Sequence, residues 1–133
     1  MKIDDFKEII ICVIIVIIVV TFDFISSNYT KNSVSELEYG LNQMRQDLEK
    51  DDKDKEKIIN DMIFIKKNWK EKFQKLAFYI EHDELEKVEN DIYGIAANVE
   101  TEEYEQAIEN LERCKFLLYH IKDKEEFNLK NLF

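Results

Sequence analysis

The sequence predicts an all-α protein: an N-terminal transmembrane helix, a long heptad-patterned helix, and two antiparallel helices that close a small three-helix bundle. Three observations lead to this fold class. The 133 residues include no proline and only two glycines, so the chain lacks the residues that tight turns and sheets need. Charged residues make up 36% of the chain, and apolar residues recur between them at helical spacing. One segment near the N-terminus is almost entirely apolar.

That segment, FKEIIICVIIVIIVVTFDFI, covers residues 6–25, and residues 9–22 within it carry no charge. Twenty residues at about 1.5 Å each give about 30 Å, the thickness of the hydrocarbon core of a bilayer. A cleaved signal peptide is the alternative, but Phe24 and Ile25 stand before the candidate cleavage serines, where small residues are required. We therefore expect an uncleaved anchor that contacts the lipid bilayer through residues 6–25.

The orientation of this anchor follows from the basic residues on its two sides. Lys2 and Lys7 lie on the N-terminal side, whereas Lys31 and then Arg45 are the first basic residues on the other side. The positive-inside rule favours a cytoplasmic N-terminus. We expect a single-pass protein of the cell membrane with an extracytoplasmic C-terminal domain.

Beyond the anchor, assigned to residues 1–30, we expect a charged helical stalk at 31–57 and a helical bundle with an apolar C-terminal tail at 58–133. The sequence SVSE, from Ser33, matches a capping box and predicts a helix start. A heptad seam runs on through the charged stretch EKDDKDKEK, which is interpreted as solvated helix with a kink or, alternatively, as a hinge. The apolar seam positions are Val34, Leu37, Leu41, Met44, Leu48, Ile58, Met62, Ile65, Trp69 and Leu76.

Two shorter amphipathic helices follow this long one. Asp83 and Thr101 are the predicted N-caps of these helices. Short connections make neighbouring helices antiparallel, so the end of the long helix, 84–98 and 102–121 should form the three-helix bundle.

Charge is distributed unevenly over the chain, whose formal net charge is -10. Residues 81–112 include twelve acids and one base, whereas residues 66–75 include five lysines and one acid. We expect these two runs to form complementary faces of neighbouring helices. The acidic balance excludes nucleic acid as a partner, because phosphate contacts need clustered basic residues.

The sequence contains no catalytic, cofactor-binding or metal-binding motif. Its two histidines, His82 and His120, are not in an H-E-x-x-H or Glu-x-x-His pattern. Cys114 occupies an apolar stripe, which predicts a buried, inert thiol, and Cys12 lies in the anchor, so we expect no disulfide. A hydrolase or metal-binding domain is therefore disfavoured, and we expect no enzyme activity, cofactor or metal.

Two groups of apolar residues are candidates for a role in packing or partner docking. Trp69 and Phe73 share one helix face and are the predicted core aromatics. The C-terminal tail carries Phe127, Leu129, Leu132 and Phe133. This tail either folds back along the bundle or docks on a partner, and we expect the first because small bundles need every apolar residue they can bury.

The sequences FYIEHDELEKVENDI, from Phe78, and LERCKFLLYHIKDKEEFNLKNLF, from Leu111, resemble a family of small proteins. The family is a clostridial-type group of single-pass membrane proteins with a domain of unknown function, and the resemblance extends over residues 6–133. Its members are often encoded beside multi-pass YetF-like membrane proteins. The resemblance implies a membrane-protein partner and carries no activity.

These observations lead us to expect a non-enzymatic, membrane-anchored helical protein. It would act as an interaction or accessory subunit of a membrane protein or envelope assembly. The alternative is a bitopic coiled-coil assembly factor of the cell-division or sporulation type, which could form a homo-oligomer through the heptad seam.

Overall fold

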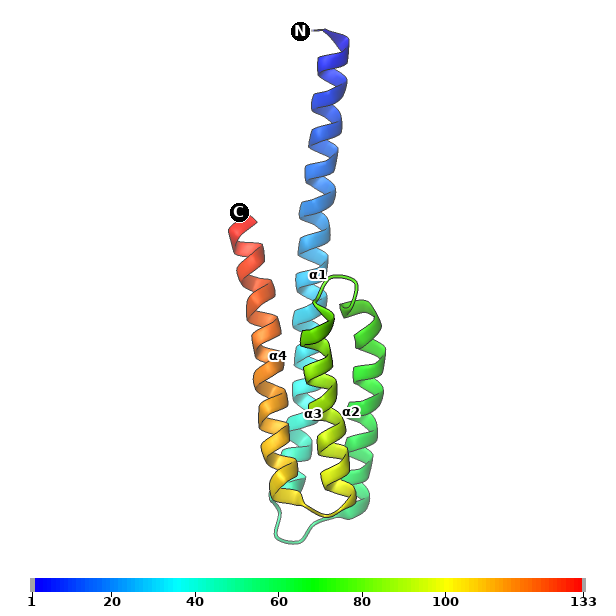
Figure 1. Cartoon of the computed structure of the whole chain (residues 1–133), viewed down its shortest axis with the longest axis vertical. Helices are drawn as coiled ribbons and strands as arrows, with labels where there is room; N and C mark the ends of the chain where they lie inside the picture. Colours follow the sequence, from blue (N-terminus) through cyan, green and yellow to red (C-terminus); the bar gives the residue numbers. More distant parts are fainter. Residues whose placement is uncertain (1, 133) are drawn as a thin grey trace.

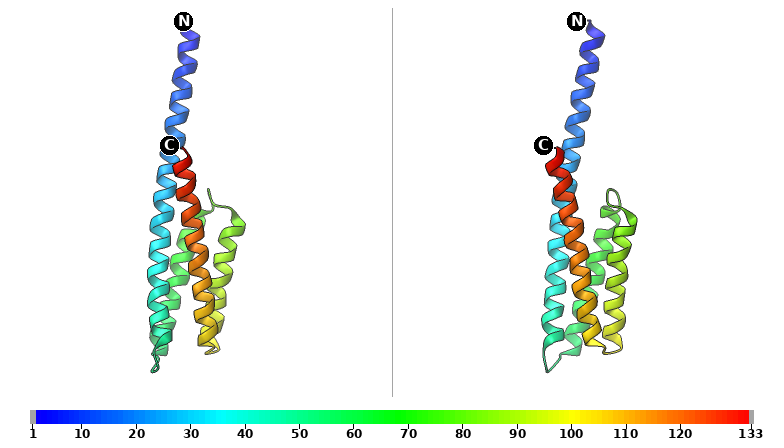
Figure 2. Two further views of the ribbon diagram at one scale, coloured as in Figure 1. Left: turned by 90° about the vertical axis from the view of Figure 1, so that its left-hand side faces the viewer. Right: turned by 60° about the vertical axis from the view of Figure 1, so that its left-hand side comes forward.

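The computed structural model describes the backbone of residues 2–132 and the side chains of residues 2–131. Four helices follow one another: α1 (Ile3–Glu49), α2 (Lys55–Leu76), α3 (His82–Glu100) and α4 (Tyr104–Leu132). The described residues contain no strand, so the prediction of an all-α protein is confirmed. The helices form an antiparallel bundle, and the N-terminal part of α1 projects from it alone (Figures 1 and 2).

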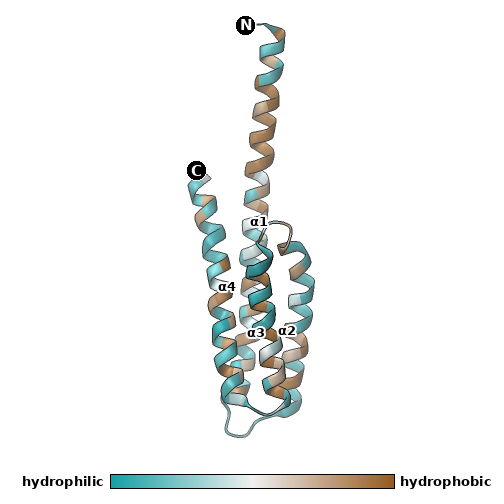
Figure 3. Cartoon of the chain, in the orientation of Figure 1, coloured by the Kyte–Doolittle hydropathy of each residue, from teal (hydrophilic) through white to brown (hydrophobic). Residues whose placement is uncertain are grey.

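Helix α1 combines two different surfaces in 47 continuous residues. Its N-terminal part is long and apolar enough to cross a membrane (Figure 3). The large apolar side chains of this part are exposed. Burial begins at Ser26 and Ser27, where α1 enters the bundle. The predicted helix start at Ser33 is wrong, because α1 contains no residue between the anchor and Ser33 that would interrupt its backbone hydrogen bonds.

The predicted stalk is also part of the bundle. Leu37, Leu41 and Met44 are fully buried, and this part of α1 packs against both α2 and α4. The bundle therefore has four helices instead of the expected three, and residues 31–57 do not form a separate element.

The reason is a turn in the charged stretch, which was expected to remain helical. Helix α1 ends at Glu49, and α2 begins at Lys55 with Asp54 as its N-cap; the Asp54 carboxylate accepts a hydrogen bond from the Lys57 backbone N–H at 3.2 Å. The turn reverses the chain, so the two halves of the heptad seam pack on each other. Residues with acceptor side chains favour such a cap, and burial of both apolar stripes stabilises the reversal.

The later helix boundaries also differ from the predicted caps. Helix α3 begins at His82, so Asp83 lies in its first turn, where a carboxylate still interacts favourably with the helix dipole. Thr101 ends α3 instead of starting α4, and its hydroxyl donates to the Ala97 carbonyl oxygen at 3.1 Å.

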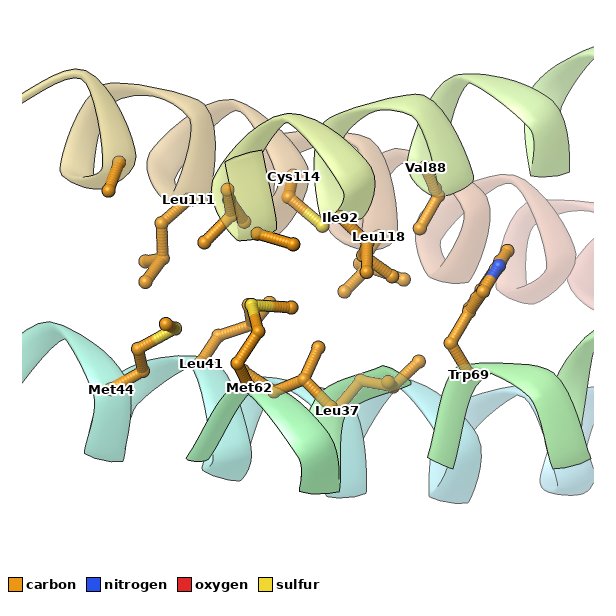
Figure 4. Packing of buried hydrophobic residues seen from close by; sticks show 14 of the residues in the cluster. Leu37, Leu41, Met44, Met62, Trp69, Val88, Ile92, Leu111, Cys114 and Leu118 are labelled. Atoms are coloured by element: carbon orange, nitrogen blue, oxygen red, sulfur yellow. The ribbon is translucent and has the colours of Figure 1, made fainter. Parts of the chain in front are cut away.

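Apolar side chains from all four helices meet in one core (Figure 4). Gly40 lets α1 and α2 approach closely, because a Cβ atom there would lie 3.0 Å from the Phe64 ring. The buried residues of α3 and α4 complete this core: Leu85, Val88, Ile92, Ile95, Ala96, Val99, Ala107, Leu111, Cys114, Leu118 and Ile121.

The expected pairing between the lysine-rich and acid-rich runs is wrong. Among the five lysines of residues 66–75, Lys72 forms an ion pair, and its partner is Glu36 of α1 at 3.0 Å. The acidic run pairs with basic residues outside that lysine run, as in Arg113–Asp91 and Arg45–Glu112. The lysine-rich and acid-rich runs do not pair with each other because a groove separates the outer surfaces of α2 and α3.

Candidate partner-binding groove

The groove between α2 and α3 is the candidate functional site. These two helices pack less closely than the other neighbouring pairs of the bundle. A hollow between them has a volume of about 550 Å³ and is open to solvent. Its lining residues are Ile63, Lys66, Lys67, Trp69, Lys70, Phe73, Gln74, Glu89, Ile92 and Tyr93.

Trp69 forms the base of this hollow. Its side chain is 3% exposed and extends from α2 towards α3, near Val88 (Figure 4). The indole N–H donates to a Glu89 carboxylate oxygen at 3.1 Å, which gives the buried ring its polar partner. The Phe73 ring lies edge-on to it, with 5.8 Å between the ring centroids. The two expected core aromatics therefore contribute both to the core and to the wall of the groove.

The groove continues along α2 towards the end of the bundle that lies away from the apolar segment. A second hollow adjoins the first at Ile63 and Lys66, and a third adjoins the second at Ile59 and Val99. From Gln74 to Lys55 the groove follows about 28 Å of α2, at about 1.5 Å per residue. This length matches a partner helix of about five turns.

Exposed apolar side chains form the rim of the groove, and sequence reasoning missed them. Ile59 and Ile63 are more than half exposed, as is Tyr93 on the opposite helix. Each isoleucine directly follows a buried seam residue, Ile58 or Met62. A second apolar stripe beside the seam was the signal that could have identified this surface.

Three lysines of α2 line the groove. Lys66, Lys67 and Lys70 have no carboxylate within ion-pair distance among the described residues. The Lys66 ammonium instead lies 5.9 Å from the centre of the Tyr93 ring, within range of a cation–π interaction. Cations beside apolar surface suit a ligand that is both apolar and acidic.

The C-terminal tail takes a different form from the one expected. Helix α4 continues to Leu132, so residues 122–132 extend the helix along α1 instead of folding back. Leu129 is half-buried against α1, and Phe127 is exposed. The Leu132 side chain and Phe133 lie outside the described residues. The extension is helical because α1 continues past the bundle and provides a surface beside it.

The remaining candidate residues do not form a chemical site. Cys114 is buried, and its burial raises the pKa of the thiol to about 12. His82 lies near Glu86, whereas His120 is 4.0 Å from Glu84. No cluster of three metal-ligating side chains occurs among the described residues.

A carboxylate pair at the α1–α2 junction was not anticipated from the sequence. Burial first, and then the hydrogen bond and charge of Asp47, raise the pKa of Asp61 to about 7. Burial alone would raise the pKa of Asp47, but its hydrogen bonds with Asp61, Lys57 and Lys50 outweigh that effect and hold it at about 2. One proton is therefore shared by the pair up to about neutral pH.

The fold and the groove define a class: a four-helix-bundle domain carried on an apolar N-terminal helix. The chain belongs to the family described as a domain of unknown function (DUF4363), whose model matches residues 24–132. This match confirms the resemblance to an uncharacterised domain family. The family match begins at Phe24, so nearly all of the apolar segment lies outside it. Comparison with curated proteins and with solved structures gave no significant match.

Proposed function

We propose that this chain is a non-enzymatic, membrane-anchored helical protein that serves as an accessory subunit of a multi-pass membrane protein or envelope assembly. The observation that carries the proposal is the open α2–α3 groove, with its apolar rim and three lysines that have no ion-pair partner in the part of the chain that the structure describes. Exposed apolar surface flanked by charge is typical of protein-binding sites, because an apolar partner gains free energy by displacing water there.

The charges of the groove support one kind of occupant, an amphipathic helical segment with acidic residues on one edge. Its apolar face would cover Ile59 and Ile63, and its carboxylates would pair with Lys66 and Lys70. Helix-in-groove recognition uses this arrangement of regularly spaced apolar anchors. The resemblance to a clostridial-type single-pass family favours a YetF-like multi-pass membrane protein as the partner.

The continuity of α1 supports the anchor. No linker separates the apolar segment from the buried part of the helix, so a bundle on such an anchor would stand at a fixed height above the bilayer. The basic residues Lys2 and Lys7 favour a cytoplasmic N-terminus with the bundle outside. The groove would then be available to an extracytoplasmic segment of the partner.

Thiol labelling in intact cells tests this orientation. Ser35 is exposed, and Ser35→Cys in a Cys12→Ala background gives one accessible thiol, since Cys114 is buried. We expect a membrane-impermeant maleimide to label Cys at position 35 without lysis. The Cys12→Ala parent is the control, and labelling only after gentle lysis would reverse the proposed orientation.

The coiled-coil assembly factor remains the second candidate, but the heptad seam favours it less. The seam residues Leu37, Met44 and Ile65 are buried within a single chain. A homo-oligomer through the same seam would have to open the bundle first. We therefore rank the groove above the seam as the interaction surface.

Charge reversal in the groove tests the proposed binding mode. A photo-crosslinking amino acid at Ile63 in the full-length protein should form an adduct with a multi-pass membrane protein in native membranes, identified by mass spectrometry. Lys66→Glu/Lys70→Glu should abolish the adduct. The matched control is Lys87→Glu/Lys122→Glu, which changes the same charge away from the groove.

The same experiment can contradict the proposal in two ways. A crosslinker at Phe116, which is exposed on α4 away from the groove, reports on nonspecific collisions. Equal yields at positions 63 and 116 would remove the groove from consideration. Loss of the adduct in both double variants would show that net charge, and not the groove lysines, controls binding.

A further inference from the structure

The end of the bundle nearest the apolar segment of α1 carries several exposed apolar side chains. We define this membrane-proximal collar as Phe24 and Ile25 of α1, Phe78 of the α2–α3 connection and Phe127 of α4. Each of the four is at least 60% exposed, and Phe78, at 86%, exceeds the other three. Isolated exposed apolar residues are common, but here they gather at one end of the molecule.

Tyr79 holds the α2–α3 connection against α1. The Tyr79 hydroxyl donates to the Ser26 carbonyl oxygen at 3.0 Å and lies 2.7 Å from the Thr30 hydroxyl. The Tyr79 ring also lies edge-on to Phe22, with 6.3 Å between centroids. Phe78 is therefore held beside the point where the exposed apolar surface of α1 ends and its buried surface begins.

The end of α4 lies at the same level of α1 and extends beyond it. One hollow between α4 and α1 is lined by Asp23 and Glu125, among others, and a second by Phe24 and Leu129. Figures 1 and 2 show the end of α4 beside α1 and past the α2–α3 connection. Phe127 therefore belongs to the collar although it is far from Phe78 in sequence.

Aromatic and basic side chains occupy the next level of the bundle. Tyr29 lies in α1, and the ammonium groups of Lys72 and Lys75 lie 5.8 Å and 5.6 Å from its ring centre. Aromatic rings favour the headgroup level of a bilayer, where lysines can extend towards the phosphates. Acidic residues also lie close by, at Glu81 and Asp83, so attraction to anionic lipid is not the driving force.

We propose that the collar rests in the interfacial region of the bilayer, so that the bundle lies directly on the membrane. This inference depends on the proposed membrane anchor and adds two contacts far from it in sequence, at Phe78 and Phe127. The collar is continuous with the apolar segment, and an interface covers exposed rings that would otherwise face water.

Site-directed spin labelling of the full-length protein in phosphatidylcholine vesicles tests the proposal. Nitroxide labels are attached to cysteine at position 78 or 127 in the Cys12→Ala background. The measured quantity is collision with oxygen relative to collision with a water-soluble nickel complex, which rises with depth. Position 17, within the apolar segment, is the deep reference, and position 116, on the exposed face of α4, is the aqueous reference.

We expect the oxygen-to-nickel ratio at positions 78 and 127 to lie between the two references. A ratio at position 78 equal to that at 116, with position 17 still deep, would overturn the collar and leave the anchor standing. The bundle would then stand away from the lipid, or a protein would cover Phe78. An aqueous ratio at position 17 would overturn the anchor itself, and the collar with it.

Discussion

Helix α1 has two halves that share one backbone and differ in almost everything else. Residues 9–22 are apolar on every side and exposed, whereas residues 26–48 are amphipathic and bury one stripe in the core. A helix that is apolar all round requires an apolar surrounding, and an amphipathic helix requires one apolar neighbour. The pattern changes from apolar on every side to amphipathic at Ser26, and this position marks where the environment of the helix changes.

The comparison shows that continuity of a helix does not imply continuity of its environment. Neither glycine nor proline marks the transition, and the backbone hydrogen bonds run through it. Small polar side chains mark it instead: the hydroxyls of Thr30 and Tyr79 gather around the Ser26 carbonyl oxygen. The following variants alter one half at a time, so each should leave the other half intact.

The largest effect should come from charge in the apolar half. Ile14→Lys/Ile17→Lys places two charges in the proposed span at a cost of about 5–7 kcal/mol, from about 2.5–3.5 kcal/mol each. We expect the chain to move from the membrane to the soluble fraction in cell fractionation. Circular dichroism should show that the bundle remains helical. The control, Ile14→Leu/Ile17→Leu, should stay in the membrane, and retention of the lysine variant would contradict the anchor.

A cavity in the buried half should have the next largest effect. Leu41 is 1% exposed, so Leu41→Ala should lower the free energy of unfolding by about 2–5 kcal/mol in urea titrations of the detergent-solubilised protein. Membrane fractionation should not change. Tyr39→Ala, on the exposed side of the same helix, should change stability by less than about 0.5 kcal/mol. Equal effects of the two variants would restore the interpretation of this segment as a stalk.

The junction between the halves should show a smaller effect. Tyr79→Phe removes the hydroxyl that donates to the Ser26 carbonyl oxygen, at a cost of about 0.5–1.5 kcal/mol. The same urea titration measures it, with Tyr39→Phe as the matched control on an exposed ring. No difference between the two variants would mean that water replaces the Tyr79 hydroxyl at no cost.

A pH effect is expected at the far end of the buried half, where α1 leads into α2. The pKa of Asp61 is about 7 in the folded chain and takes its ordinary value of 3.8 when unfolded, so the folded state binds more protons between these values. The free energy of unfolding should therefore fall as pH rises from about 4 to about 7. Asp47, with its pKa lowered to about 2, loses its contribution only as pH falls towards that value.

Asp61→Asn removes this titration, because an amide does not ionise and can still donate to Asp47. We expect a flatter dependence of stability on pH between 4 and 7, measured by thermal unfolding. Asp52→Asn, in the exposed turn between α1 and α2, should keep the original slope. An unchanged slope in the Asp61 variant would show that the pair holds no extra proton.

Local pattern predicted the helices well and their ends less well. The spacing of Leu85, Val88 and Ile92 predicted α3, and all three are buried. The capping signals at Ser33 and Thr101 did not start helices, because Ser33 lies inside α1 and Thr101 is the C-cap of α3. The stretch 50–54 reversed direction although lysine and glutamate around it favour helix.

The groove could be predicted only in part. Trp69 and Phe73 were identified from the sequence, whereas the exposed positions of Ile63 and Tyr93 depend on how far α3 stands from α2. The ion pairs could not be predicted from the sequence either, since Lys72 pairs with Glu36 of α1 instead of with a residue in the acidic run. Both features depend on which helix faces which, and spacing along one chain does not contain that information.

The sequence by itself determined the helical content, the apolar segment and most of the buried stripe, because these depend on residues within a few turns of one another. Only the tertiary structure decided that the charged stretch turns, that four helices instead of three form the core, and that three lysines beside a groove have no ion-pair partner among the described residues. The physical reason is that the apolar stripe of an amphipathic helix can be buried equally well against many different apolar neighbours. Packing of the whole chain is what selects one set of neighbours and leaves the α2–α3 surface open.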